Sequence, residues 1–350
     1  MVRPRHARAI NRNSIILMIQ LYHRPAPAAT PSVMAVRAVF CRPMSLARRL
    51  LLRASRSAWL AGQLRDRAFL RRAMRRFMPG EELPAALGAA AELAALGIGS
   101  VLTQLGEQVA ARGEAARVRD HYLDVLAQVG ARRLPAEISV KLTHLGLDVD
   151  RAACLADVQV LARAAADAGS FLWIDMEESC YVDATLEMFR SVRSAHERVG
   201  VCLQAYLRRT PADLGALLPL APAIRLVKGA YNEPATIAYP SKRDVDAAYL
   251  VLAERLLERV ARREARAVFG THDLALVKRV RERATTLRVT PGSYEVHMLY
   301  GIRSPEQRAL ARDGVPVRVL ISYGTHWFPW YMRRLAERPA NVWFVVRNLI

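Results

Sequence analysis

Short apolar runs alternate with amphipathic helical segments from residue 137 onward, and this alternation limits the possible folds more than any other feature. Each run is nearly continuous in hydrophobic residues, as in strands that are buried on both faces of a parallel sheet. Eight strands separated mostly by helices predict an α/β fold, and the number eight favours a (βα)8 barrel over a doubly wound sheet, which is the alternative. The runs cover residues 137–143, 171–177, 199–207, 224–231, 266–272, 294–301, 315–324 and 341–346.

Polar side chains stand toward the carboxyl ends of six successive runs. In (βα)8 barrels this rim carries the active site. A strand end is also where a chain meets water, so each residue alone has a structural explanation, and Lys141 and Asp175 could form a structural ion pair. Their recurrence on successive strands favours an active-site rim and, with it, the barrel. The residues are Lys141, Asp175, Gln204, Arg225 with Lys228, His272 and His297.

The charge balance is strongly basic, with a formal net charge of +20, which is typical of nucleic-acid binders. Only four of the 52 basic residues are lysines, however, and residues 1–65 contain twelve arginines and no Asp or Glu. The excess of positive charge therefore reflects a general preference for arginine over lysine and the basic composition of residues 1–65. An arginine-rich RNA-binding protein is an alternative, but the sequence has no RNP, KH or zinc-knuckle signature. We expect no nucleic-acid partner.

The four cysteines, Cys41, Cys154, Cys180 and Cys202, show no metal-binding spacing, and three of them lie in apolar surroundings. Buried thiols suit a reducing compartment. No apolar run is long enough to span a bilayer. We therefore expect a cytoplasmic protein without a metal site.

The chain is predicted to have three regions. Residues 1–43 form an irregular basic extension, expected to be disordered or a start artefact, with a targeting peptide as the alternative. Residues 44–130 form a helical region whose basic amphipathic beginning suits contact with a membrane surface. Residues 131–350 form the barrel. Gly97 and Gly99 lack the third glycine of a dinucleotide-binding loop, and we predict a helix end there.

The segment WYMRRLAERPAN (residues 330–341) is predicted to be a helix. Trp330, Tyr331 and Arg334 fall on one apolar stripe at helical spacing, and Arg333 lies next to this stripe. A guanidinium on an apolar stripe needs an anionic partner or a wet cavity. The alternative is that its charged end reaches out of an interface into water.

Several motifs, taken together and in this order, resemble the proline dehydrogenase family over roughly residues 70–350. The most specific are LVKGAY, THD and MRRLAERPAN. The resemblance implies a distorted (βα)8 TIM-type barrel preceded by N-terminal helices, with FAD at the carboxyl-end mouth. The motifs are FMPGEEL, GIGSVLTQLGEQV, ISVKLTHLG, IDMEES, LQAYLRR, IRLVKGAYNEP, FGTHD, YEVHMLYGIR and YMRRLAERPANV.

The resemblance also implies roles for individual residues. Arg333 and Arg334 would bind the substrate carboxylate, a task that suits bidentate guanidinium groups, with Glu337 holding Arg333 in place. Asp175 and Arg225 would be catalytic, with Asp175 paired to Lys141. The remaining implied contacts are Lys141 and Leu299 with the substrate, and Met176, Gln204, Lys228, Gly229, Ala230, Thr271 and His272 with FAD.

Three positions depart from the family pattern. Trp330 stands where a tyrosine usually precedes the arginine pair, and Leu320 stands at an expected strand tyrosine, with Tyr323 close by. His297 replaces a frequent glutamine, and either side chain can donate a hydrogen bond. The missing tyrosines would shape the pocket around the substrate ring, so they leave the substrate preference open.

The implied reaction is the oxidation of L-proline to Δ1-pyrroline-5-carboxylate by hydride transfer to the flavin, the first step of proline catabolism to glutamate. A membrane quinone is the implied electron acceptor, which would place the protein on the inner face of the membrane. The alternatives are a hydroxyproline-selective enzyme of the same fold and a barrel enzyme without flavin that forms a Schiff base on Lys228.

Overall fold

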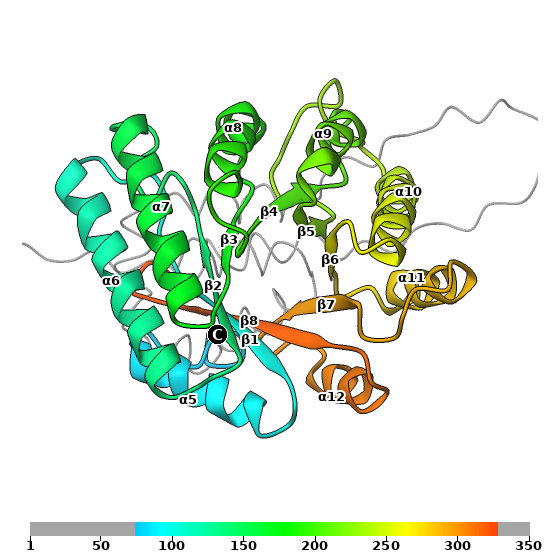
Figure 1. Ribbon diagram of the computed structural model, residues 1–350, viewed down its shortest axis with the longest axis horizontal. Coiled ribbons are helices and arrows are strands. Elements are labelled where there is room, and N and C mark those ends of the chain that lie inside the picture. Colours follow the sequence, from blue (N-terminus) through cyan, green and yellow to red (C-terminus); the bar gives the residue numbers. More distant parts are fainter. Residues whose placement is uncertain (1–73, 328–350) are drawn as a thin grey trace, which may run out of the picture. The chain divides into compact units, whose positions relative to one another are not determined.

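Eight parallel strands close into a barrel in the computed structural model, which describes residues 74–327 (Figure 1). The strands follow one another around the barrel in chain order, and β8 pairs with β1. This confirms the predicted (βα)8 barrel and excludes the doubly wound sheet. The strands are β1 (Gly99–Gln104), β2 (Ala136–Val140), β3 (Leu172–Ile174), β4 (Val199–Gln204), β5 (Ala223–Val227), β6 (Arg266–Gly270), β7 (Tyr294–Leu299) and β8 (Val317–Tyr323).

Helices cover the outer face of the barrel (Figure 1). Tyr122, Phe189 and Tyr249 are fully buried between this helical layer and the sheet, so the outer core explains the apolar faces of α6, α8 and α10. The described helices are α5 (Leu83–Ala94), α6 (Arg112–Ala131), α7 (Arg151–Asp167), η1 (Ser179–Tyr181), α8 (Val182–Arg193), α9 (Thr210–Leu217), η2 (Leu218–Leu220), α10 (Lys242–Ala261), α11 (Leu274–Thr286) and α12 (Ser304–Arg312).

The helix end predicted at Gly97 and Gly99 is confirmed, but the first strand of the barrel, which begins directly after it, was not predicted. Helix α5 ends at Ala94, Gly97 turns the chain with φ +71°, and β1 begins at Gly99. This strand has only two long apolar residues, Val101 and Leu102, so it shows no apolar run of its own, and its pairing with β2 and β8 decides its structure. The barrel therefore starts inside residues 44–130, the region predicted to be helical. The run 341–346, predicted as the eighth strand, lies outside the described residues.

Helix α5 packs against both β1 and β8. It is held there at its amino-terminal side, because Gly324 N, just after β8, donates a 2.9 Å hydrogen bond to Glu81 O. In a regular (βα)8 barrel the helix that follows the last strand would pack at this place. The outer groove between the last and first strands is thus already occupied.

The interior of the barrel has an apolar layer and a charged layer. Val101, Trp173, Ala223 and Val268 form a buried cluster together with Phe171, and Leu320 packs against it. Below it, at the amino ends of the strands, two carboxylates bind two guanidiniums. Glu137 accepts a 2.6 Å hydrogen bond from Arg266, and Glu295 accepts bonds of 2.7 and 2.8 Å from Arg266 and Arg318. The charged layer closes the amino end, and the predicted site residues lie toward the carboxyl end.

Gly200→Ala should lower the free energy of unfolding by about 1–3 kcal/mol, because a Cβ at this position would lie 2.5 Å from the Trp173 ring and overpack the interior. Gly88→Ala on the exposed side of α5 is the matched control. No atom lies within 4 Å of its Cβ position, so the better helix former should raise the stability by about 0.5–1 kcal/mol. Denaturant unfolding of both variants checks this, and a loss of stability at Gly88 would contradict the packing argument.

Candidate active site

A buried arginine, an aspartate and a serine form the centre of the candidate site. Arg225 on β5 is only 3% exposed. Its Nη2 donates a 2.8 Å hydrogen bond to Ser139 Oγ on β2 and forms an ion pair with Asp175, directly after β3. Ser139 Oγ in turn donates a 2.9 Å bond to Asp175 Oδ1. Burial lowers the pKa of Arg225, but the charge of Asp175 together with the contributions of Cys202 and Glu137 offsets this, so the pKa is raised overall and the guanidinium stays charged.

The structure pairs the charged residues of the mouth differently from the prediction. Lys141 was expected to pair with Asp175. Instead it forms an ion pair with Glu107, which lies in the loop after β1, while Asp175 pairs with Arg225. The prediction of a Lys141–Asp175 pair was therefore wrong. Glu107 lies in the motif GIGSVLTQLGEQV, but nothing in the sequence paired it with Lys141.

Several buried polar atoms near the centre have no hydrogen-bond partner among the described residues. These are Arg225 Nη1, Gln204 Oε1 and both ring nitrogens of His297. His297 Nε2 lies 3.5 Å from Glu295 Oε2, which is an ion-pair separation rather than a hydrogen bond, and burial lowers the pKa of His297. A buried polar atom without a partner is costly. Their presence at the carboxyl end therefore indicates a place for a polar ligand.

Two further predicted site residues contact each other. His272, after β6, accepts a 2.8 Å hydrogen bond at Nε2 from the backbone N–H of Leu299 at the end of β7. Since Nε2 accepts, the ring is neutral, with its proton on Nδ1. Thr271 accepts a 3.1 Å bond at Oγ1 from the backbone N–H of Asp273. The THD motif thus fixes the position of Leu299.

The loop after β5 carries the predicted residues Lys228, Gly229 and Ala230. Gly229 has φ +117°, and a Cβ there would lie 2.2 Å from the ring of Tyr206, so this position needs glycine. The close approach that the structure contains is therefore to Tyr206. Lys228 Nζ lies 2.5 Å from Asp246 Oδ1.

The strand β8 shows whether Tyr323 can replace the tyrosine that the family pattern expects at Leu320. Leu320 packs against the interior cluster and is aligned with Leu299 across the β7–β8 pair. Tyr323 faces α6 instead, where its hydroxyl lies 2.8 Å from His121 Nε2. Because side chains alternate along a strand, Tyr323 cannot take the place of an interior tyrosine.

The remaining predicted residues divide into two groups. Met176 is buried, and Gln204 donates a 2.7 Å hydrogen bond from Nε2 to Glu177 O, which links the ends of β3 and β4. Trp330, Tyr331, Arg333, Arg334 and Glu337 lie outside the described residues.

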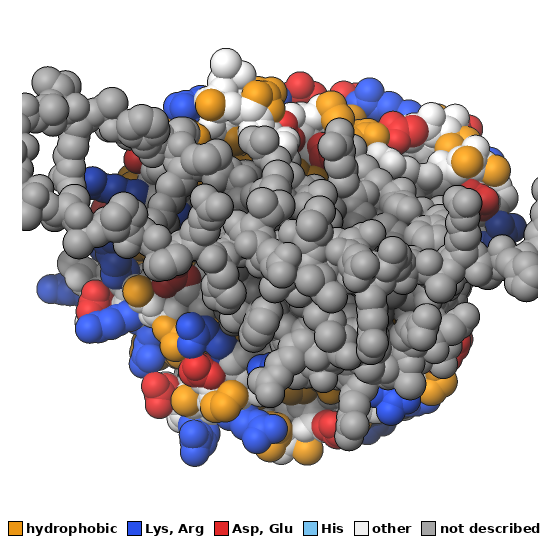
Figure 2. Space-filling view, turned by 180° about the vertical axis from the view of Figure 1, so that it is seen from behind, with side chains coloured by type: hydrophobic (Ala, Val, Ile, Leu, Met, Phe, Trp, Pro, Cys, Tyr) orange, Lys and Arg blue, Asp and Glu red, His pale blue; other side chains and the backbone are white. Residues whose placement is uncertain are grey.

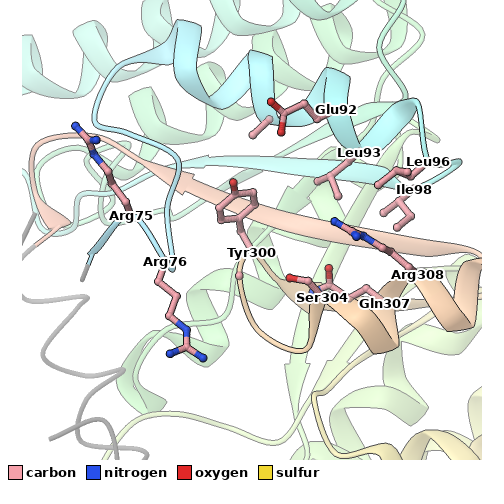
Figure 3. A pocket seen from close by; sticks show the side chains of 12 residues that line it. Arg75, Arg76, Glu92, Leu93, Leu96, Ile98, Tyr300, Ser304, Gln307 and Arg308 are labelled. Atoms are coloured by element: carbon pink, nitrogen blue, oxygen red, sulfur yellow. The ribbon is translucent and has the colours of Figure 1, made fainter. Parts of the chain in front are cut away.

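A pocket of about 200 Å³ lies elsewhere, between α5 and α12. Figure 3 shows Glu92 and Leu93 from α5 on one side and Ser304, Gln307 and Arg308 from α12 on the other. It contains none of the predicted site residues, so it is separate from the candidate site. On the face shown in Figure 2, Lys and Arg side chains are interspersed with Asp and Glu among the described residues. This mixture differs from the basic patch of a nucleic-acid binder.

Comparison with known proteins identifies the class to which this barrel and site belong. Residues 86–347 match the family described as "Proline dehydrogenase". Proline dehydrogenase 1 of Bacillus subtilis subsp. natto is 33% identical over 276 residues, covering 79% of this chain and 90% of that protein. Proline dehydrogenase of Deinococcus radiodurans is 35% identical over 280 residues, covering 79% of this chain and 89% of that protein. The chain belongs to the proline dehydrogenase family.

Solved structures support the fold. Proline utilization A from Bdellovibrio bacteriovorus, in a crystal structure of the protein inactivated by N-propargylglycine, has a TM-score of 0.73 and 22% identity, covering 83% of this chain. The chain spans about a third of that longer protein, 36% of its length. Among the described residues no helix is long and apolar enough to cross a membrane.

Asp175→Ala should lower the free energy of unfolding by about 3–5 kcal/mol, because it leaves the buried Arg225 guanidinium without its ionised partner. Glu187→Gln is the control. It removes an ion pair between exposed side chains, Arg151 and Glu187, which is worth less than about 1 kcal/mol. Denaturant unfolding of both variants measures the difference. Equal losses would show that the Asp175–Arg225 pair is not buried from water.

Proposed function

We propose that this protein binds FAD at the carboxyl-end mouth of the barrel and oxidises L-proline to Δ1-pyrroline-5-carboxylate. As a member of the proline dehydrogenase family, the chain is an oxidoreductase that acts on proline. The observation that carries the proposal is the buried Asp175–Arg225 pair, which stands beside unpartnered polar atoms at the end of the barrel where such sites are built.

The polar atoms at the mouth fit a flavin, which presents both hydrogen-bond donors and acceptors. Arg225 Nη1 and Gln204 Oε1 supply one donor and one acceptor that no described residue uses. When bound, FAD would supply the acceptor for the hydride that leaves C5 of proline. The residues proposed to hold it are Met176, Gln204, Lys228, Gly229, Ala230, Thr271 and His272.

Arg225 and Asp175 are proposed to act together. Arg225 provides a fixed positive charge at the mouth, and Asp175 and Ser139 hold it in place before the reaction begins, so no reorganisation is needed during it. The ring nitrogen of proline must be neutral when the hydride leaves, because its lone pair drives that step. A nearby positive charge disfavours the protonated amine.

Arg333 and Arg334 are proposed to bind the proline carboxylate. The support from the described residues is indirect. Helix α5 already packs in the outer groove between β8 and β1, so that place is taken for a segment that follows β8. Lys141 and Leu299 would complete the substrate pocket, with the His272 contact holding Leu299 over the ring.

Two alternatives are less well supported. A Schiff-base lysine needs a free amine that can reach the carbonyl of a substrate, but Lys228 Nζ is held in ion pairs with two carboxylates, 2.5 Å from Asp246 and 3.0 Å from Asp273. A hydroxyproline-selective site needs a polar partner for the extra hydroxyl. Leu299 and Leu320, side by side on β7 and β8, offer an apolar wall at that point, so proline is favoured.

We also propose that a quinone accepts the electrons and that the protein is cytoplasmic. Residues 44–76 would contact the inner face of the membrane. Family membership supports the acceptor, and the basic amphipathic pattern of that segment supports the contact.

The purified protein should show the visible absorption of a flavin, and anaerobic addition of L-proline should bleach it. The rate constant with proline should exceed that with trans-4-hydroxy-L-proline by about 10- to 100-fold, because a hydroxyl buried against two leucines lacks a partner. Stopped-flow absorbance measures both rates. A colourless protein would refute the proposed cofactor, and equal rates would refute the proposed preference.

Arg334→Met should raise KM for proline while the protein keeps its flavin. The loss of a charge-assisted contact costs about 2–4 kcal/mol, which corresponds to a roughly 30- to 700-fold rise. Arg312→Met, at an exposed position on α12, is the control and should leave KM unchanged. Steady-state kinetics with the flavin content measured in parallel test this. An unchanged KM in Arg334→Met would remove Arg334 from the site.

A further inference from the structure

Lysine is rare in this chain, and its few positions are therefore informative. Of 52 basic residues only four are lysines. Lys141 and Lys228 lie at the mouth of the barrel, and Lys242 begins α10, close to Lys228. Lys278 is the exception, an exposed residue of α11. Because nearly all other basic residues are arginines, a lysine suggests a position at which an ammonium group suits the surrounding partners better than a planar guanidinium.

Lys228 and Lys242 share two aspartates, and we call these four residues the charge ring. Lys228 Nζ lies 2.5 Å from Asp246 Oδ1 and 3.0 Å from Asp273 Oδ2. Lys242 Nζ lies 3.1 Å from Asp273 Oδ2 and also forms an ion pair with Asp246. Each aspartate therefore contacts both lysines, and the charge ring is neutral as a whole.

The charge ring connects three segments at the carboxyl-end side of the barrel: the loop after β5, the start of α10 and the residue before α11. Lys228 lies directly after β5, Lys242 and Asp246 lie in the first turns of α10, and Asp273 precedes α11. Asp273 is itself fixed, since its Oδ1 accepts a 3.2 Å hydrogen bond from Ala275 N as the N-cap of α11. Burial raises the pKa of Asp273, but the hydrogen bonds from the two lysines outweigh this and lower it to about 2, so the carboxylate stays charged.

The directions of the N–H donors distinguish lysine from arginine at this position. An ammonium has three N–H donors that point in three directions, whereas the donors of a guanidinium lie in one plane. Two donors of Lys228 are engaged by Asp246 and Asp273. No third partner engages the ammonium among residues 74–327, and the side chain is 25% exposed, so the remaining donor can face a ligand. Because the two aspartates fix the ammonium from one side, they also fix the direction of the third donor.

We propose that Asp246 and Asp273 are positioning residues that hold the Lys228 ammonium so that its remaining N–H donor faces FAD. This inference rests on the proposed function. It adds Asp246, which lies outside every quoted motif, and gives a role to Asp273, the last residue of the THD motif. The residues act through Lys228 and do not themselves touch the cofactor, whose phosphates would repel a carboxylate.

Asp246→Asn and Asp273→Asn test the proposal, because both keep the shape of the side chain and asparagine also serves well as an N-cap. Holoenzyme with the full chain is diluted serially, and the fluorescence of released FAD gives its dissociation constant. Each variant should bind FAD about tenfold more weakly than the wild type. Glu282→Gln, which breaks the exposed Lys278–Glu282 pair on α11, should have no effect.

The same substitutions in a Lys228→Met background show whether the aspartates act through the lysine. The expected result is that Asp246→Asn and Asp273→Asn no longer change FAD affinity once Lys228 is absent. Lys228→Arg should bind FAD as weakly as Lys228→Met, since the planar fork cannot engage both carboxylates and still present a third donor in the same direction. Circular dichroism and thermal unfolding of each variant establish that the fold is retained.

The outcomes separate this inference from the proposed function. If the wild type binds no FAD, both are overturned. If the wild type binds FAD and the two asparagine variants bind it equally well or more tightly, the positioning role is overturned and the proposed function stands. Equal losses with and without Lys228 would likewise overturn the positioning role, because the aspartates would then act by another route.

Discussion

The ion pair between Arg225 and Asp175 is the interaction on which the rest of the site depends. A guanidinium that is 3% exposed is tolerated only when a carboxylate and further hydrogen-bond acceptors surround it. These partners come from β2 and the end of β3, while the arginine itself comes from β5. Three strands must therefore keep their order and register for the charge to be buried at all, and the closed barrel provides this.

Polarity changes along the axis of the barrel. The amino end holds two carboxylates and two guanidiniums that satisfy one another, and the apolar cluster around Trp173 lies above them. The carboxyl end holds Arg225, Gln204 and His297, which have polar atoms without a partner in the part of the chain that the structure describes. Charge at the amino end thus stabilises the structure, whereas the incomplete hydrogen bonding at the carboxyl end is what a binding site requires.

Much of the fold could be predicted from the sequence, because seven of the strands are apolar runs separated by helices. The strand β1 could not, since it has only two long apolar residues, Val101 and Leu102, and follows a glycine turn. The carboxyl-end location of the site was predictable from the fold class, but the pairing was not: which charges meet across strands depends on register and on loops, as with Glu107. Asp246 and Asp273 carry no periodic signal, and only the folded chain brings them beside Lys228.

The pairing of β1 with β8 joins parts of the chain that are far apart in sequence, with Gly99 aligned to Arg318. Bringing such distant segments together is entropically costly, so the contacts across this seam must offset that cost. Helix α5 packs across both strands of the seam, and Gly324 bonds to Glu81 just ahead of that helix. Residues 81–94 thereby hold the first and last strands together, and the closure of the barrel depends on these contacts as well as on the β1–β8 pairing.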